Sequence, residues 1–218
     1  MNTWTEESSA GEAPRQRIMA AAIRLFAKKG FSATGVRELA AAADVKPSMI
    51  NYYFGSKQGL LEQLLDDFFS RYLNAVKEIF MTERPPEEQF RRYVRLVASF
   101  FVDNPEMMRV TFLELPHDAP EIAAFKARRI KRIKNLVLTE LLPRIGEQMK
   151  RPFRPEIVGP ALIGMISVHF MLRPVIENVF EMTFDPDFYK DYPEYITELF
   201  LYGVLGEEPP GQDGTASR

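Results

Sequence analysis

The sequence predicts an all-α protein in which three short helices at the N-terminus precede a larger helical bundle. Apolar residues recur at the helical spacing of three and four residues, and prolines divide the chain into segments of helical length. Apolar residues make up 46% and charged residues 27% of the 218 residues, as is typical of a globular chain with a buried core. Cysteine is absent, which excludes disulfides, thiolate metal sites and cysteine nucleophiles.

The first helix is expected over residues 14–29. Gly30 can end it in the left-handed conformation, and the cations Lys28 and Lys29 favour a helix C-terminus. Its apolar side chains have the spacing of one core-facing surface, and they are Ile18, Ala21, Ala22, Leu25 and Phe26.

Two short helices are expected next, separated by a turn. Thr34 is a candidate N-cap for the first of them, and Asp44 stands in the turn, where a residue tolerant of positive φ is needed. Pro47 can begin the other helix, at a position where its missing N–H costs nothing. Three short helices with these turns predict a helix-turn-helix domain, whose second helix enters the major groove of DNA.

The exposed start of the third helix is expected to contact bases. Ser48 can hydrogen-bond a base edge, Met49 can touch a thymine methyl group, and Lys46 can reach a guanine or a phosphate. The predicted base contacts are Lys46, Pro47, Ser48 and Met49. Phosphates are expected at free helix N-terminal amides and nearby donors, and the predicted contacts are Thr34, Gly35, Arg37, Asn51, Tyr52, Tyr53 and Lys57.

Charge is distributed unevenly along the chain. Residues 13–57 carry eight basic and two acidic side chains, a net charge of +6, whereas residues 58–218 carry −5 and the whole chain −2. This asymmetry suggests a basic module facing DNA on an acidic body.

Residues 15–65 resemble the N-terminal module of the TetR (tetracycline-repressor-like) family of bacterial transcription regulators. The resemblance rests on Ala22-x-x-Leu25-Phe26, Gly30, Thr34, Leu39-Ala40, Ala43-x-Val45 and Tyr53-Phe54-Gly55-Ser56-Lys57. It implies a homodimer, a helical regulatory domain that binds a small molecule, and weaker operator affinity when that ligand is bound. The chain departs from the family pattern at Asn51 (commonly tyrosine), Tyr53 (commonly histidine), Asp44 (usually glycine) and Lys46 (usually a small capping residue).

The remainder of the chain is expected to form a regulatory and dimerisation bundle, for about nine helices in all. Its helices are predicted near residues 57–80, 86–103, 105–114, 120–149, 156–180 and 187–205. The predicted domains are a disordered arm (1–13), the helix-turn-helix domain (14–56), the ligand-binding and dimerisation domain (57–205) and a disordered tail (206–218).

Two helices of this bundle are candidates for a dimer interface. Residues 161–172 are apolar on almost every face, so they pack either in a core or against a second copy. The last helix is similarly two-sided. The predicted interface residues are Leu162, Ile166, Phe170, Ile196 and Phe200, and the alternative is a monomer with a thick core.

Phenylalanines and methionines in the bundle suit a small, largely apolar effector of unknown identity. The predicted pocket residues are Phe101, Met108, Phe112, Met165, His169 and Arg173, although the same residues are also explained as core. The basic run 126–134 is interpreted as a solvated outer face.

We therefore expect a homodimeric, sequence-specific regulator of transcription, most simply a repressor that a ligand releases from a palindromic DNA operator. No cofactor, metal site or enzymatic activity is expected, because the sequence has none of the usual phosphate-loop, nucleophile or metal-ligand motifs. A cytoplasmic protein without a membrane partner is expected, because residues 1–7 do not resemble a secretory signal and the longest apolar run is too short to span a bilayer. The alternatives are a helical ligand-binding or enzymatic protein that keeps the module as scaffold, and an activator or architectural DNA binder without an effector.

Overall fold

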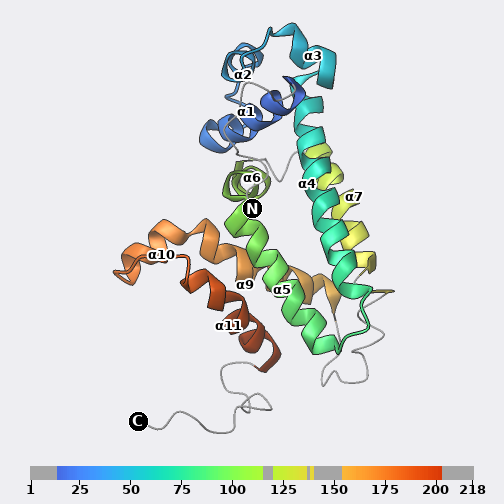
Figure 1. Cartoon of the computed structure of the whole chain (residues 1–218), viewed down its shortest axis with the longest axis vertical. Coiled ribbons are helices and arrows are strands. Elements are labelled where there is room, and N and C mark those ends of the chain that lie inside the picture. Colours follow the sequence, from blue (N-terminus) through green and yellow to red (C-terminus); the bar gives the residue numbers. More distant parts are fainter. Residues whose placement is uncertain (1–13, 115–119, 137, 140–153, 203–218) are drawn as a thin grey trace. The chain divides into compact units, whose positions relative to one another are not determined.

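The computed structural model describes residues 14–114, 120–136, 138–139 and 154–202, and these residues contain helices and connecting turns without strands. Figure 1 shows the helices in their order along the chain, and they fall into two compact units. Unit 1 comprises Met1–Glu78 and Phe100–Thr139, and unit 2 comprises Ile79–Ser99 and Glu140–Arg218. The predicted arm, the predicted tail and the end of the predicted 120–149 helix lie outside the described residues. The predicted domain boundary between residues 56 and 57 stays a prediction.

Unit 1 begins with the three short helices α1 (Pro14–Lys29), α2 (Val36–Ala42) and α3 (Ser48–Phe54). Their shared core contains Ile18, Phe26, Leu39 and Ile50, all of which are fully buried. The turns have the left-handed backbone that the sequence predicts, with φ of 84° at Gly30 and 51° at Asp44.

The start of α2 differs from the prediction, because its N-cap residue is Gly35 and no side chain caps it. Thr34 lies one residue earlier, and its hydroxyl donates to the Gly30 carbonyl oxygen at 2.8 Å. Thr34 therefore closes the loop between α1 and α2 instead of capping α2.

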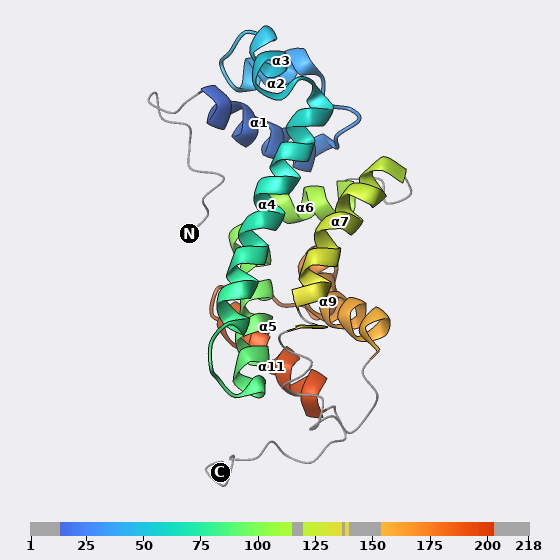
Figure 2. The same ribbon diagram turned by 90° about the vertical axis from the view of Figure 1, so that its right-hand side faces the viewer.

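Helix α3 leads directly into the long helix α4 (Lys57–Phe80), as Figure 2 shows. The Ser56 hydroxyl accepts a hydrogen bond from the Gly59 amide at 2.9 Å, which satisfies one of the free amides at the start of α4. Gly55, in the preceding turn, has a φ of 74°.

The rest of unit 1 contains the end of α5 (Pro86–Asp103), α6 (Pro105–Arg109), the π-helix η1 (Val110–Glu114) and α7 (Pro120–Leu136). Helix α7 lies beside α4 (Figure 2), and the Arg129 guanidinium donates through Nε to the Asp66 carboxylate at 2.8 Å. Helix α6 and η1 pack against α1. Unit 1 therefore joins the three short helices to a helical support.

Unit 2 contains most of α5 together with α9 (Pro155–Met171), α10 (Arg173–Val179) and α11 (Phe188–Tyr202). The prediction of one helix over 156–180 is wrong, because α9 and α10 meet at a bend of 72° beside Leu172. The bend has a local cause: Pro174 in the first turn of α10 disfavours continuous helix through the residues that precede it.

Ion pairs and ring stacking join α5 to α11 within unit 2. Arg91 pairs with Glu194 of α11, and the Phe90 and Phe200 rings stack with centroids 5.2 Å apart. Of the described helices, none alone has the length and apolar character needed to cross a membrane; α9 and α10 meet that criterion only as a bent pair.

Candidate nucleic-acid interface and ligand-binding residues

The start of α3 forms an exposed tip, which we define as residues Lys46, Pro47, Ser48 and Met49. The first three are exposed and Met49 is half-buried. Ile50 follows the tip and is fully buried, so it anchors α3 in the core of the three-helix module. The predicted base contacts therefore form one continuous stretch that faces solvent.

The other end of α3 carries exposed hydrogen-bonding side chains. Asn51 is exposed, and Tyr52 is 79% exposed, which is unusual for a large aromatic residue. Tyr53 is half-buried, and its ring packs edge-on against the Tyr52 ring with centroids 5.0 Å apart. Gly35 and Arg37, near the start of α2, are also exposed. These five residues, which are among the predicted phosphate contacts, are therefore accessible to DNA, although Tyr53 is only partly so.

Thr34 does not fit the predicted phosphate contact. The residue is 1% exposed, its hydroxyl donates to the Gly30 carbonyl oxygen, and its amide donates to the Phe31 carbonyl oxygen at 3.3 Å. Both of its donors are thus used within the protein. The prediction treated Thr34 as the free end of α2, whereas it is part of the loop core.

Lys57 is also occupied within the protein. Its ammonium donates to the carbonyl oxygens of Phe31 and Thr34, each at 2.9 Å, and lies 4.2 Å from the centroid of the Phe31 ring. These contacts fasten the start of α4 to the loop between α1 and α2. They give Lys57 a role in positioning the module, and its predicted phosphate contact stays a prediction.

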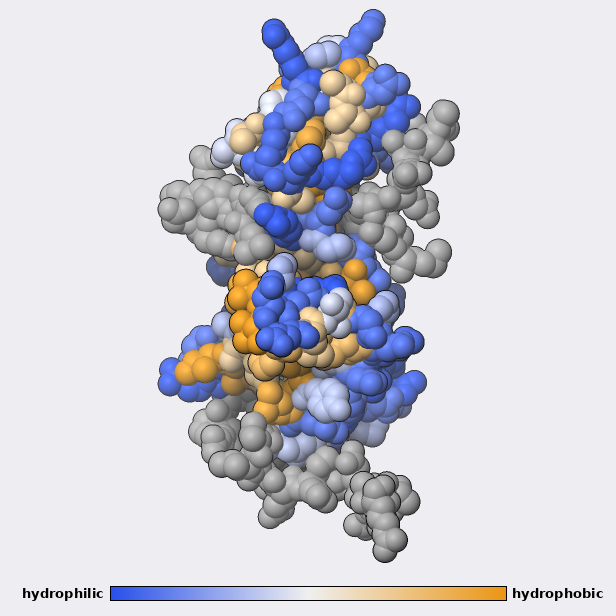
Figure 3. All heavy atoms as spheres, turned by 90° about the vertical axis from the view of Figure 1, so that its left-hand side faces the viewer, coloured by the Kyte–Doolittle hydropathy of each residue, from blue (hydrophilic) through white to orange (hydrophobic). Residues whose placement is uncertain are grey.

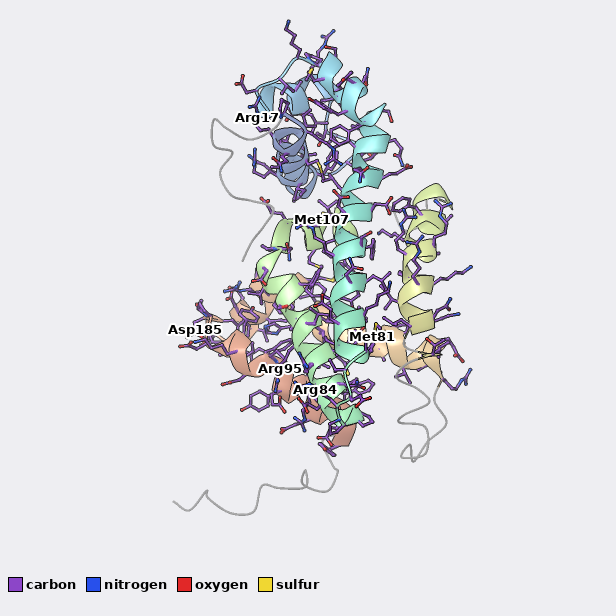
Figure 4. All side chains as sticks on the ribbon, turned by 45° about the vertical axis from the view of Figure 1, so that its right-hand side comes forward. Arg17, Met81, Arg84, Arg95, Met107 and Asp185 are labelled. Atoms are coloured by element: carbon purple, nitrogen blue, oxygen red, sulfur yellow. The ribbon has the colours of Figure 1, made fainter. Side chains whose placement is uncertain are left out.

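Arg17 is a positioning residue that the sequence reasoning missed. Its guanidinium donates to the carbonyl oxygens of Ala43 at 3.1 Å and Asp44 at 3.2 Å, so α1 holds the turn that precedes the tip (Figure 4). A signal existed in the sequence: Arg17 stands four residues before the apolar Ala21 and so borders the buried face of its helix.

Several cations of the basic segment stabilise the module itself. Arg15 lies over the Phe54 ring at 5.6 Å from its centroid, and Lys29 pairs with Glu38. The hydrogen bond from Lys29 lowers the pKa of the Glu38 carboxyl. Like Arg17 and Lys57, these residues therefore make contacts within the module.

The six predicted pocket residues are divided between the two units. Phe101, Met108 and Phe112 belong to unit 1, whereas Met165, His169 and Arg173 belong to unit 2. Phe101 and Met108 are buried, and the Phe101 and Phe112 rings lie 5.4 Å apart.

Arg173 makes one contact within α10 and one that crosses the turn after it. Its Nε donates to the Glu177 carboxylate at 2.9 Å and its Nη2 to the Phe184 carbonyl oxygen at 2.6 Å. These contacts indicate that Arg173 stabilises this turn.

His169 lies in a cluster of aromatic rings within unit 2. Five ring centroids lie 4.6–5.8 Å from the His169 centroid, and they belong to Phe170, Phe184, Phe188, Tyr189 and Tyr192. The His169 Nε2 atom is buried and has no hydrogen-bond partner among the described residues. Burial lowers the pKa of the imidazole, and the charge of Arg173 lowers it further, against a smaller opposing effect of Glu177.

This lowered pKa predicts that acid destabilises unit 2. The folded state prefers neutral His169, so its contribution is fully present above the unfolded pKa of about 6.5 and is lost as the pH falls below that value. We expect a larger loss of unfolding free energy between pH 7.5 and pH 5.5 in the wild type than in His169→Gln, measured by urea unfolding. His117→Gln, which changes the other histidine, is the control. Equal losses in His169→Gln and the wild type would contradict the prediction.

The predicted dimer residues do not form an exposed surface. Leu162, Ile166 and Ile196 are all less than 10% exposed. Phe170 stacks on Tyr189 at 5.1 Å, and Phe200 stacks on Phe90.

Other apolar residues on the same two helices face solvent. Val168 and Leu172 are 47% and 48% exposed beside α9, and Tyr195 and Leu199 are 71% and 41% exposed on α11. We call these four residues the exposed apolar stripe. Figure 3 shows apolar patches at the surface of one face of the molecule.

The part of the chain that the structure describes contains no group of three or more histidine, aspartate or glutamate side chains arranged to hold a metal ion.

Comparisons with known proteins agree with this geometry. Residues 18–64 match the family described as bacterial regulatory proteins, tetR family. The chain is 26% identical over 187 residues to the probable HTH-type transcriptional regulator YttP of Bacillus subtilis, covering 84% of this chain and 89% of the relative. It is 27% identical over 144 residues to the HTH-type transcriptional repressor NicS of Pseudomonas putida, covering 66% of this chain and 67% of the relative.

A solved structure shares the fold. The transcriptional regulator FadR from Bacillus subtilis, in complex with stearoyl-CoA, matches 86% of this chain and 98% of its own with a TM-score of 0.72 and 18% identity. The all-α prediction, with an N-terminal helix-turn-helix and a helical C-terminal domain, is confirmed. The N-terminal match and the named relatives lead to one conclusion: residues 18–64 are a DNA-binding domain of the tetR family of bacterial regulatory proteins, in a chain that is similar over most of its length to transcriptional regulators.

Proposed function

We propose that the protein is a homodimer that represses transcription from a palindromic operator and leaves the operator when a small, largely apolar ligand binds. The observation that carries the proposal is the exposed tip of α3, which Ile50 anchors on one side and Arg17 supports through the preceding turn. An exposed recognition segment on a rigid support is what sequence-specific readout requires.

In this proposal the residues of the module divide into two classes. Lys46 and Ser48 reach base edges, and Pro47 and Met49 make apolar contacts in the groove. Arg37, Asn51 and Tyr52 hold phosphates and set the register of the protein on the duplex. Lys57 and Arg17 keep the two classes in place.

A homodimer follows from the geometry of an operator with two half-sites. Two copies of α3 must be separated by about 34–36 Å to enter successive major grooves on one face of the duplex. The exposed apolar stripe is the surface that we propose for this pairing, because large apolar side chains left exposed in the single chain are candidates for burial in an interface.

The ligand is proposed to be an acyl chain or a molecule of similar shape. NicS is named a repressor, and FadR was solved with stearoyl-CoA, which supports a repressor with a long apolar ligand. In unit 1, α6 and η1 pack against α1, so a ligand that displaces them would also move the module. A coupling of about 1–3 kcal/mol is typical of such regulators.

Substitutions in the module test the proposed DNA docking, once an operator has been selected from a random DNA pool. Ser48→Ala should relax discrimination at one base pair by roughly tenfold, because it removes a base contact. Arg37→Ala should lower the affinity for all DNA sequences by the same factor and reduce the dependence of that affinity on salt, because it removes a phosphate contact. Fluorescence anisotropy with matched and mismatched duplexes measures both effects.

Lys131→Ala is the control, because Lys131 is exposed on α7, outside the module. Unchanged DNA binding in both Ser48→Ala and Arg37→Ala, or no enriched sequence from the pool, would overturn the proposed docking.

A further inference from the structure

A buried lysine joins α7 to the π-helix η1 within unit 1. Lys126 is 8% exposed, although lysine is almost never buried to this degree without a charged partner. Its ammonium donates to the Thr111 carbonyl oxygen at 2.6 Å. Within the described residues this neutral oxygen is its hydrogen-bond partner.

Arg129, three residues later on α7, shows how the same helix stabilises a cation elsewhere. Its guanidinium pairs with Asp66 of α4 and lies 4.0 Å from the centroid of the Phe125 ring. Arg129 therefore already fastens α7 to α4. Lys126 is therefore not needed to attach α7 to α4. Burying its charge without an opposite charge beside it costs free energy.

The two segments that the hydrogen bond between Lys126 and Thr111 joins carry apolar side chains. Thr111 directly precedes Phe112, whose ring packs on Phe101, and it follows the α6 residue Met107, which is 1% exposed (Figure 4). Phe125, next to Lys126 on α7, is 7% exposed. Adaptable methionine and aromatic side chains around one charged group are typical of a site for an amphiphilic small molecule.

Burial also lowers the pKa of the Lys126 ammonium. An anionic ligand group beside it would favour the charged form again, and an ammonium has three donors, of which Thr111 takes one. The Thr111 hydroxyl already donates to the Met107 carbonyl oxygen at 2.8 Å, so η1 is held from both sides. π-Helices are rare and occur frequently at functional sites.

We propose that Lys126 binds the anionic group, a carboxylate or a phosphate, of an amphiphilic ligand whose apolar chain lies beside Phe101, Met107 and Phe112 in unit 1. This inference rests on the proposed function, in which the effector is largely apolar, and it adds the charge that the effector must carry. An anion can bind the two donors that Thr111 leaves free, and because it attracts the ammonium more strongly than the neutral carbonyl does, it weakens the contact with Thr111. Because η1 packs against α1, a change at Thr111 is transmitted to the DNA-binding module.

Binding of three probes to the full-length protein tests the inference: palmitate, palmitoyl-CoA and hexadecanol. The first two carry a carboxylate and phosphates respectively, and hexadecanol supplies a comparable apolar chain without charge. We expect the wild type to bind at least one anionic probe about tenfold or more tightly than hexadecanol, because charge-assisted contacts are the stronger ones. The preferred anionic probe identifies the head group.

Lys126→Met removes the charge and keeps an unbranched apolar side chain. It should lower the affinity for the anionic probe to that for hexadecanol and leave hexadecanol binding unchanged. Lys131→Met, a substitution at an exposed position of the same helix, should leave the preference unchanged. Thermal unfolding of the free protein supplies a second readout: Lys126→Met should melt at or above the wild-type temperature, because it removes a buried charge.

The outcomes distinguish the inference from the function on which it rests. A wild type that binds none of the probes would overturn the proposed apolar effector and, with it, this inference. Equal wild-type affinity for anionic probes and hexadecanol would overturn the inference alone. The inference alone would also be overturned if Lys126→Met still bound the anionic probe more tightly than hexadecanol. It would be overturned too if Lys126→Met melted at a lower temperature than the wild type and bound none of the three probes, since Lys126 would then serve only to stabilise the fold.

Discussion

Gly59→Ala should break the junction between α3 and α4 and abolish DNA binding. A Cβ atom at Gly59 would clash with the carbonyl oxygen of Phe54 and lie 3.3 Å from its carbonyl carbon, and neither atom belongs to a side chain that can rotate away. The backbone between them is already constrained, because Gly55 has a positive φ and Ser56 caps the Gly59 amide. Relieving the overlap requires a shift of α3 against α4. We expect the free energy of unfolding to fall by about 3 kcal/mol, which is the upper end of the usual cost of adding atoms to a closely packed site.

Gly164→Ala is the matched control for this substitution. Gly164 also lies within a helix, but a Cβ atom there meets nothing within 4 Å. Its replacement should raise stability by about 0.5–1 kcal/mol, because alanine loses less conformational entropy on folding than glycine. Urea unfolding followed by circular dichroism measures both variants. If Gly59→Ala unfolded at the same urea concentration as the wild type, the junction between α3 and α4 could adjust without cost, and the prediction would be wrong.

The three-helix module could be predicted from the sequence because local rules determine it. Gly30 and Asp44 have the left-handed backbone that their residue types favour, and α1 and α4 begin and end where they were expected. Each of these features depends on residues within one or two turns of the same segment. The sequence contains that information without any knowledge of tertiary contacts.

The partners of individual donors could not be predicted in the same way. Lys57 contacts the carbonyl oxygen of Phe31, 26 residues away, and Arg17 contacts that of Ala43 over the same separation. An ammonium or guanidinium can donate to a phosphate or to a backbone carbonyl, so residue type alone does not decide between them. Tertiary packing decides, and it places both cations inside the module.

The side of α9 that faces solvent could not be predicted for a related reason. Because α9 is apolar on nearly every face, its periodicity does not distinguish the side that faces the core from the side that faces solvent. Ile166 was predicted at the interface and is fully buried, whereas Val168, two residues later, is 47% exposed. Tyr192 of α11 determines the orientation, since its hydroxyl donates to the carbonyl oxygens of Met165 and Ile166 and turns that side of α9 inward.

Leu199→Glu should convert the proposed homodimer to monomers. Leu199 is 41% exposed in the single chain, so a glutamate there stays solvated and the subunit remains folded. In a two-fold interface each substitution occurs on both copies, so two carboxylates lose solvent in the same contact. Analytical ultracentrifugation should show monomers of this variant at concentrations where the wild type is dimeric. Ile130→Glu, at an apolar position of α7 that is 53% exposed, is the control and should remain dimeric.

Loss of the dimer should also reduce operator binding by about 10²–10⁴-fold, because the second half-site is no longer bound within the same complex. Affinity for a duplex with a single half-site should stay at the wild-type value, since the tip of α3 and its support are in unit 1 and Leu199 is in unit 2. Anisotropy titrations with one-site and two-site duplexes separate these quantities. If Leu199→Glu kept wild-type affinity for the two-site duplex, the exposed apolar stripe would not be the pairing surface. If it lost affinity for the single half-site as well, the substitution would have disturbed the module itself.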